Sequence, residues 1–544
     1  MTEPAAPHEE ATAASWTQRA SLALTVDSRL WTFVIAGAAV LGCLLRALRW
    51  IDNPGLWLDE SFLSINLLDK SFSGILGQLQ FLQSAPPAFL AVQKGIETTV
   101  GNADWELRAF PVFASLVSVL LFVYIARKLL APPAAALAVL LFATSEPMLL
   151  RAADVKHYST DVAATTILVA LYLWATDVPI EHRSHRIVVL VVVAPITVAF
   201  SFAAAFVVAA LIAALLVCAL EARSQQTAYI AIAGGVAALL SFGAVYAVAA
   251  SNLKHVSASI LGSGGDQHVS VGHLRTVKNA WWMFKDPGGF VNDTNSLAAL
   301  LAGLAVVALW KRGSLDRFAL LVAPFAFAAV ADAARRYPLG GRFSFFLVPL
   351  ILVLVGRGAQ ALVGLSRRPL LVGAGVALFL VGPTLAIAAY HATKPPARSD
   401  IKPLLSHLVR DWRPGDSLYV YPDAQYQLRY YTECTDCAIS GKTFPWPSRL
   451  APPGPPGDQY ARALESVPPT VVVGSRTDPS APLGDLSRLP RRGRVWLLFS
   501  TDPLSHHGLD DENLILWTLE RKGKLLDELR VRGARLYLVQ RNGA

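Results

Sequence analysis

The feature that most constrains this chain is an alternation of apolar runs, about 15 to 24 residues long, with short polar links between residues 30 and 390. About 20 apolar residues suffice to cross a bilayer as a helix. Only 16% of the 544 residues are charged, against roughly a quarter in ordinary globular domains. The sequence therefore predicts a polytopic α-helical membrane protein. About eleven transmembrane helices are expected, over residues 30–48, 108–127, 132–150, 158–176, 187–200, 202–220, 227–250, 296–310, 318–333, 342–357 and 369–390.

The two ends of the chain differ from this membrane domain, which we place at residues 30–390. Residues 1–29 are polar and Ala-rich, which is typical of a disordered tail. From about residue 391 to 544 the chain is polar, proline-rich and aromatic, and helical periods alternate with short apolar strands such as "DSLYVYP", "PPTVVVGS", "GRVWLLFS" and "ARLYLVQR". We expect a soluble C-terminal α/β domain with a mainly parallel sheet.

The charges of the links indicate the orientation. Residues 85–101 carry Gln93, Lys94 and Glu97, and burial of such charges at mid-bilayer costs several kcal/mol, so we expect a helix in the interface rather than a crossing. With a cytoplasmic N-terminus, the short basic links then lie on the inner side, as the positive-inside rule requires. The outer loops, residues 49–107 and 251–295, and the C-terminal domain face outward.

Charge and cysteine content limit the classes of partner. The net charge of +9 is weak evidence for nucleic acid in a membrane protein, and neither a nucleic-acid motif nor a Gly-rich phosphate loop is present in the sequence. Cys434 and Cys437 stand close together in "ECTDC". A zinc site would need a second pair of ligands, for which only His506 and His507 are candidates at an unsuitable spacing. A disulfide is the favoured interpretation, in an oxidising compartment.

Two adjacent carboxylates follow the first crossing, in "GLWLDESF": Asp59 and Glu60. An Asp at this place could simply cap a helix. However, the predicted topology puts them on the same membrane face as a third acid, Asp154, and three cations, Arg108, Lys156 and Arg342. Asp154 could instead be a link residue that pairs with Lys156.

Acids and cations on one outer face suit an enzyme with a lipid-linked phosphate donor. Arginine offers two parallel hydrogen bonds to a phosphate, and a carboxylate must take the proton of an attacking hydroxyl. A transporter or flippase with a soluble cap is the alternative, but transporters tend to show internal repeats and broken helices around a midplane site. A scaffold protein would not need such a cluster.

The motifs resemble those of GT-C glycosyltransferases, most closely the protein mannosyltransferase and aminoarabinose transferase superfamily and its RgtA/B/C/D-like branch. "GLWLDESF" resembles the acidic motif of the first outer loop, and "SAPPAFLAVQKGIETTVGNADWELRAFP" resembles the next block. "EPMLLRAADVKHYSTDV", which contains Lys156 and Tyr158, resembles the second outer-loop motif, and "YPLGGRFSFFLVP" a later one. The order along residues 30–360 is the same.

The resemblance implies an inverting transfer of a sugar from a polyprenyl-phosphate donor to a hydroxyl of an envelope acceptor (lipid, glycan or protein). It makes Asp59 the general base and Asp154 the second catalytic acid, and it places Arg108 at the donor phosphate. Glu60, Lys156, Tyr158 and Arg342 would complete the donor and acceptor site. No metal is expected to be obligatory, although a divalent ion is an alternative. With the Ala-rich, Lys-poor composition, the resemblance indicates a multi-pass protein of a bacterial inner membrane with a periplasmic C-terminal domain.

Overall fold

The computed structural model of the chain describes residues 28–543 except 180–181, 263–293, 312–314, 397, 436, 438, 440–443, 448, 453–460, 476–480 and 501–509. The predicted tail up to residue 27 and most of the predicted outer loop 251–295 lie outside the described residues. All eleven predicted apolar segments are helical. The helices of the membrane domain that follow these segments are α2 (Ser28–Asp52), α6 (Ala109–Leu129), α7 (Pro132–Thr144), α8 (Glu146–Arg151), α9 (Tyr158–Thr176), α10 (Arg183–Phe200), α11 (Ala204–Glu221), α12 (Gln225–Gly262), α14 (Thr294–Lys311), α15 (Leu315–Ala333), η3 (Gly341–Leu347), α16 (Val348–Leu365) and α17 (Pro369–Thr393).

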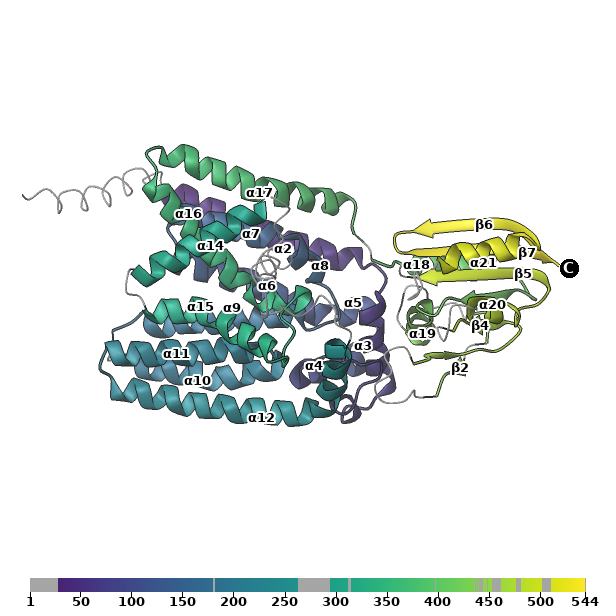
Figure 1. Cartoon of the computed structure of the whole chain (residues 1–544), viewed down its shortest axis with the longest axis horizontal. Helices are drawn as coiled ribbons and strands as arrows, with labels where there is room; N and C mark the ends of the chain where they lie inside the picture. Colours follow the sequence, from purple (N-terminus) through teal and green to yellow (C-terminus); the bar gives the residue numbers. More distant parts are fainter. Residues whose placement is uncertain are drawn as a thin grey trace, which may run out of the picture.

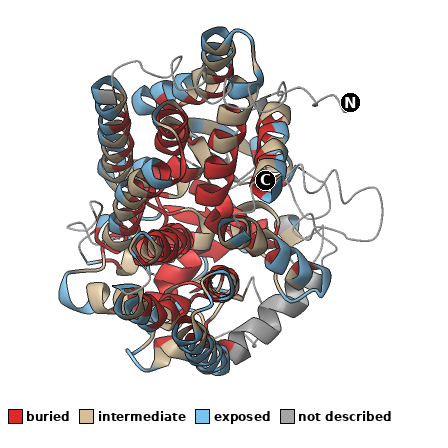
Figure 2. Cartoon of the chain, turned by 90° about the vertical axis from the view of Figure 1, so that its left-hand side faces the viewer, coloured by how far each residue is buried: buried red, intermediate tan, exposed pale blue. Residues whose placement is uncertain are grey.

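Within the described part of the chain, eight helices are long and apolar enough to cross a membrane, and α7 and α14 are shorter apolar helices. The predicted crossing 132–150 is broken at Ser145, where α7 ends and α8 begins. Pro147 explains the break, because proline lacks an N–H and its ring would clash with the carbonyl of residue 143 in a continuous helix. Large apolar side chains such as Phe33, Leu239 and Leu378 are 72–75% exposed on the outer surface of the bundle. Buried residues face its inside (Figure 2), which is the pattern of a multi-pass membrane protein.

Short elements gather at the end of the bundle next to the C-terminal domain (Figure 1). They are α3 (Leu58–Asp69), η1 (Gly74–Leu76), α4 (Pro87–Thr99) and α5 (Asp104–Leu107). Helix α4 has 13 residues, too few to cross a bilayer. Its Lys94 is bound by Glu97 at 2.5 Å and by the Leu67 carbonyl at 2.8 Å, so the two charges of this segment balance each other outside the bundle.

The C-terminal domain contains a five-stranded sheet in the order β4-β1-β5-β7-β6. Strand β1 pairs in parallel with β4 and β5, whereas β5–β7 and β6–β7 are antiparallel, so the prediction of a mainly parallel sheet is wrong. The reason is that β6 and β7 are joined by a tight turn and form a hairpin, which can only be antiparallel. The elements are α18 (Lys402–Asp411), β1 (Ser417–Val420), α19 (Ala424–Glu433), β2 (Arg449–Leu450), β3 (Leu464–Glu465), β4 (Val471–Val473), α20 (Ala481–Leu486), β5 (Arg492–Ser500), α21 (Asp511–Glu520), β6 (Gly523–Val531) and β7 (Ala534–Asn542).

The apolar core of the C-terminal domain continues into the first outer loop. Residues of α3 and α4 and residues of the sheet belong to one buried cluster, separate from the core of the bundle. At its centre the ring of Tyr426 from α19 lies 4.7 Å from Phe62 of α3 and 5.3 Å from Phe81, between ring centroids. The loop that carries the acidic pair therefore packs as part of the C-terminal domain.

Candidate active site

The acidic pair lies in the first turn of α3, and its two carboxylates are used differently. The N-cap residue is Trp57, so the interpretation of Asp59 as a helix cap is wrong. Glu60 closes the helix start instead, because its Oε2 accepts a hydrogen bond from the backbone N–H of Trp57 at 3.2 Å. The carboxylate of Asp59 is therefore available for other partners.

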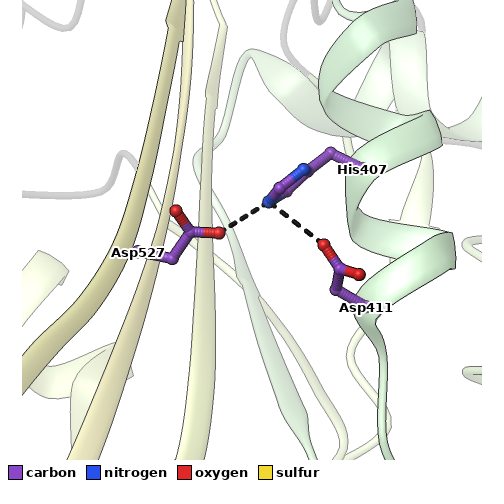
Figure 3. A group of neighbouring side chains, drawn as sticks. All are labelled: His407, Asp411 and Asp527. Carbon is purple, nitrogen blue, oxygen red and sulfur yellow. Dashed lines mark hydrogen bonds and ion pairs between the residues drawn. The ribbon is translucent and has the colours of Figure 1, made fainter.

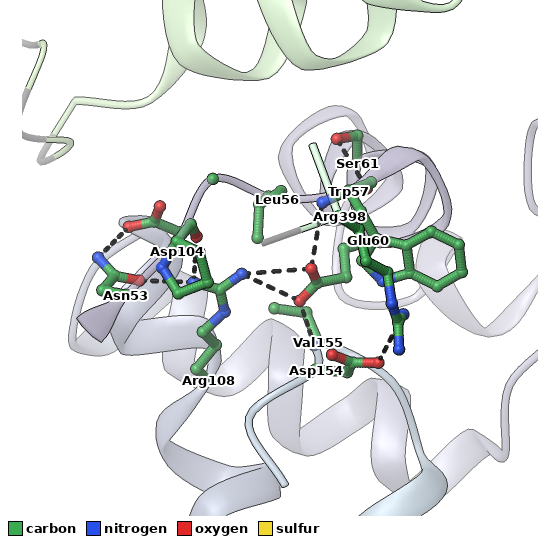
Figure 4. A network of polar contacts seen from close by, with 12 residues as sticks. Asn53, Leu56, Trp57, Glu60, Ser61, Asp104, Arg108, Asp154, Val155 and Arg398 are labelled. Atoms are coloured by element: carbon green, nitrogen blue, oxygen red, sulfur yellow. Dashed lines mark hydrogen bonds and ion pairs between the residues drawn. The ribbon is translucent and has the colours of Figure 1, made fainter. Parts of the chain in front are cut away.

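Glu60 lies at the centre of a buried network (Figure 4). Its carboxylate accepts hydrogen bonds from Arg108 Nη2 at 3.2 and 3.3 Å and from the Val155 backbone N–H at 2.8 Å. Arg108 Nη1 donates to Asn53 Oδ1 at 2.7 Å and to the Pro54 carbonyl at 2.6 Å. Burial raises the pKa of Glu60, and the Arg108 charge opposes this rise only in part. The network ties the first outer loop to the start of α6 and to the link before α9.

Asp59 faces the other way and forms an ion pair with Arg342 of η3. Burial alone would raise the pKa of Asp59, but the positive charges of Arg342 and Lys156 outweigh it and hold the pKa below its usual value. The carboxylate is thus ionised at neutral pH. Lys156 donates a hydrogen bond to Gln83, and burial lowers the pKa of its ammonium group to about 8.

Asp154 accepts hydrogen bonds from two arginines. Arg151 Nη1 lies 2.9 Å and Arg398 Nη1 lies 3.4 Å from its Oδ2. The alternative expectation that Asp154 pairs with Lys156 is therefore wrong. Burial would raise the pKa of Asp154, but the charges of Arg151 and Arg398 lower it below the usual value.

Three guanidinium groups surround the indole of Trp57. Their carbon atoms lie 4.5 Å (Arg398), 5.4 Å (Arg151) and 5.9 Å (Arg342) from the ring centroid. Arg151 also lies 5.1 Å from the ring of Tyr158. Aromatic faces attract guanidinium groups and keep them close together without neutralising their charge. This arrangement holds three positive charges around one side chain.

A small pocket opens beside this cluster. Its lining includes Glu60, Asp154 and Arg398 as well as three side chains with buried N–H groups that have no hydrogen-bond partner among the described residues. These groups are Arg49 Nη1, Trp57 Nε1 and Arg108 Nε. Buried N–H groups are costly to leave without an acceptor. A ligand with acceptor oxygens would satisfy these N–H groups, and the three arginines of the lining, Arg49, Arg108 and Arg398, outnumber its two carboxylates.

The structure brings together all seven residues that the sequence singled out. Asp59, Glu60 and Arg108 meet Asp154, Lys156, Tyr158 and Arg342 at the end of the bundle next to the C-terminal domain. Sequence reasoning missed Arg49, Gln83, Arg151 and Arg398. Arg151 stands within the quoted motif and could have been found there, whereas Arg398 is 244 residues from its partner Asp154 and no local pattern marks it.

The C-terminal domain contains one group of side chains with metal-ligand chemistry, as far as the described residues extend: His407, Asp411 and Asp527 (Figure 3). His407 Nε2 lies 2.6 Å from Asp527 Oδ2 and 3.5 Å from Asp411 Oδ2. However, Arg410 Nη2 lies 2.5 Å from His407 Nδ1 and 3.1 Å from Asp411 Oδ2. An arginine can only donate, so the Nε2 of His407 carries the proton and is not free for a metal. The group links α18 to β6. Elsewhere in the domain, a disulfide joins Cys434 and Cys437.

No protein-family model matches this chain, and no curated protein matches it in sequence. Among solved structures, ArnT from Cupriavidus metallidurans bound to undecaprenyl phosphate is 13% identical, with 94% of this chain and 98% of that chain covered and a TM-score of 0.47. The same enzyme in the apo state gives 12% identity, coverage of 92% and 98%, and a TM-score of 0.48. The oligosaccharyltransferase of Archaeoglobus fulgidus in complex with Zn and sulfate is 11% identical, with 75% of this chain but only 62% of that chain covered and a TM-score of 0.45. Both are glycosyltransferases of the GT-C fold.

Proposed function

We propose that this protein is a membrane glycosyltransferase that moves a sugar from a polyprenyl-phosphate donor to a hydroxyl of an envelope acceptor. The observation that carries the proposal is the pocket lined by Arg49, Trp57 and Arg108, each of which has a buried N–H without an acceptor among the described residues, with the ionised Asp59 nearby. The oxygens of a phosphate would accept hydrogen bonds from these N–H groups, and the carboxylate would accept the proton of an attacking hydroxyl. The resemblance of the outer-loop motifs to GT-C enzymes supports the same chemistry.

The phosphate of the donor would lie in the pocket. Arg49, Trp57 and Arg108 would each donate the N–H that lacks an acceptor, and Arg398 would add its charge. A phosphate that leaves as a dianion gains most from such donors when the bond to the sugar breaks. The apolar surface of the bundle would hold the polyprenyl chain, so that the sugar reaches the aqueous edge.

Asp59 would act as general base. The acceptor oxygen forms a bond to the anomeric carbon, its proton passes to the Asp59 carboxylate, and the bond between that carbon and the phosphate oxygen breaks with its electron pair on the phosphate. A single displacement of this kind inverts the anomeric centre. In the free protein Arg342 occupies the carboxylate, and we expect it to move toward the phosphate when the donor binds. Asp154 would position Arg151 and Arg398 for the same phosphate.

We place the reaction at the periplasmic face of a bacterial inner membrane, with residues 391–544 in the periplasm, and we expect no obligatory metal. The arginines supply the positive charge that a divalent ion would otherwise bring. Activity that is abolished by a chelator and restored by Mg²⁺ or Mn²⁺ would contradict the last point.

The direct test uses purified protein in liposomes with a panel of polyprenyl-phosphate sugars. Release of polyprenyl phosphate and a matching product, both dependent on Asp59, is the expected result. Donor that crosses the bilayer unchanged, with none consumed, would instead favour a flippase.

A further inference from the structure

The chain just before the acidic pair is held by side chains of α19. The backbone N–H of Leu56 donates to the hydroxyl of Tyr431 at 2.9 Å, and the carbonyl of Leu56 accepts from Gln427 Nε2. Leu56, Gln427 and Tyr431 are all at most 1% exposed. Both polar groups of this residue's backbone are therefore bound by one helix of the C-terminal domain.

The residues before Leu56 are held by the segment that leads into α18. Gly55 N–H donates to Asp400 Oδ1 at 2.9 Å, and Lys402 Nζ donates to the Asn53 carbonyl at 2.8 Å. A Cβ atom at Gly55 would lie 3.0 Å from Asp400 Oδ1 and 3.1 Å from Ile401 N, so any other residue would require these neighbours to shift. The backbone groups of Asn53, Gly55 and Leu56 are thus bound by side chains that follow residue 399.

The same segment delivers a residue of the pocket. Arg398 contacts both Asp154 and Trp57, and its own backbone lies against the β6–β7 turn. Gly533 in that turn has φ +72°, and a Cβ there would overlap the Arg398 carbonyl. The sheet therefore fixes where the Arg398 side chain begins.

From these contacts we propose that the C-terminal domain is a working part of the transfer site, in which Tyr431, Gln427 and Asp400 position the loop 53–57 and thereby Trp57 and Asp59. The proposal rests on the proposed glycosyl transfer. It assigns to the domain the alignment of the base rather than the recognition of the acceptor.

The test compares two tyrosines of α19. Tyr431→Phe removes the hydroxyl that binds Leu56. The other partner of this hydroxyl is Asp104 of α5, so neither bond lies within the C-terminal domain itself. Tyr426→Phe is the matched control, because Tyr426 is equally buried but its hydroxyl donates to Ala461 within the C-terminal domain. We expect kcat to fall about tenfold or more in Tyr431→Phe with little change in KM, since a misaligned base slows the chemical step. Tyr426→Phe should retain kcat within about twofold. Tyr431→Phe removes two buried hydrogen bonds, to Leu56 and to Asp104, whereas Tyr426→Phe removes the one to Ala461, so Tm should fall more in Tyr431→Phe.

Hydrogen–deuterium exchange gives a readout that does not require activity. Peptides that cover residues 53–60 should exchange faster in Tyr431→Phe than in the unchanged protein or in Tyr426→Phe. If the unchanged protein transfers no sugar, the proposed function fails, and this exchange result alone decides whether α19 holds the loop. Equal exchange in the two variants would overturn the positioning role.

Two substitutions of Asp400 give a second test, in which the conservative one should restore the function. Asp400→Ala removes the acceptor of the Gly55 N–H, whereas Asp400→Asn keeps an oxygen at the same place. We expect a loss of kcat and faster exchange of residues 53–60 in Asp400→Ala, and near-normal values in Asp400→Asn. Equal loss in both variants, or in neither, would contradict the inference.

Discussion

The two carboxylates of α3 are each paired with an arginine, one pair at the edge of the candidate site and the other in the wall of its pocket. At the edge, the side chains of Asp59 and Arg342 are 14% and 29% exposed. In the wall, Glu60 and Arg108 are 2% and 3% exposed, and further bonds to Asn53, Pro54 and Val155 surround them. The first pair is partly accessible to solvent, whereas the second is almost completely buried.

We infer from this difference that the first pair takes part in the reaction and that the second pair stabilises the fold around the site. An ion pair that is partly accessible to solvent holds its partners less firmly than an enclosed pair, so its partners can be exchanged for those of a substrate. Removal of one partner from a buried pair costs about 3–5 kcal/mol, because the other charge stays buried without compensation. We therefore expect substitutions at the edge to affect turnover and substitutions in the wall to affect stability.

The largest expected effect is that of Asp59→Asn. Loss of a positioned general base costs about two to four orders of magnitude in rate, so kcat should fall by that amount while Tm stays close to that of the unchanged protein. Glu97→Gln is a suitable control, since Glu97 is another ion-paired carboxylate of the outer loops, 2.5 Å from Lys94. Near-normal turnover of Asp59→Asn at equal protein level would remove Asp59 from the reaction.

Glu60→Gln should show the opposite profile. The neutral side chain leaves the buried Arg108 charge without its partner, and we expect a loss of about 3 kcal/mol in the free energy of unfolding. Thermal unfolding in detergent measures this, alongside kcat, which should fall less than in Asp59→Asn. A stable Glu60→Gln protein with the larger loss of kcat would reverse the roles assigned to edge and wall.

A smaller effect is expected for Arg398→Ala. The side chain is 30% exposed, so the variant should fold with a change in stability below about 1 kcal/mol. Loss of one charge-assisted bond to phosphate should raise KM for the donor about tenfold. Arg410→Ala removes another exposed arginine of the same domain and should leave KM unchanged. An equal KM in the two variants would place the phosphate elsewhere.

The smallest effect concerns pH. Lys156, with its pKa lowered to about 8, is charged below that pH and neutral above it. Loss of this charge removes a cation from the proposed phosphate-binding site, so kcat/KM should decline as the pH rises through about 8. Lys156→Arg keeps its charge throughout and should move this decline to about pH 10 or higher. A decline at the same pH in both proteins would assign it to another group.

The helical segments could be predicted because bilayer thickness fixes their length, and each of the eleven apolar runs is indeed helical. The break at Ser145 could also have been predicted from Pro147. The prediction of one segment, 132–150, relied on apolarity alone and therefore joined α7 and α8. Strand β6 was not readable. Its sequence "KLLDELRV" favours a helix, and only pairing with β7 makes it an edge strand with alternating exposure.

For the candidate site, seven residues could be predicted from the sequence, but their pairing and several of their partners could not. Asp59 and Asp154 were identified by motif and by membrane side, yet their partners Arg342 and Arg398 lie 283 and 244 residues away. Ion pairs between residues so far apart in the sequence depend on how the helices and loops pack, and no local sequence pattern predicts that packing. The cap at Trp57 was likewise hidden, because tryptophan is not a usual N-cap residue.

The bond between Leu56 and Tyr431 spans 375 residues, which has a consequence for the newly made protein. At about 5–20 residues per second, roughly 20 to 75 s pass between synthesis of the loop and synthesis of the helix that holds it. During that interval the acidic pair exists but its alignment does not. A chain whose synthesis stops before residue 398 would therefore lack the side chains that hold residues 53–57.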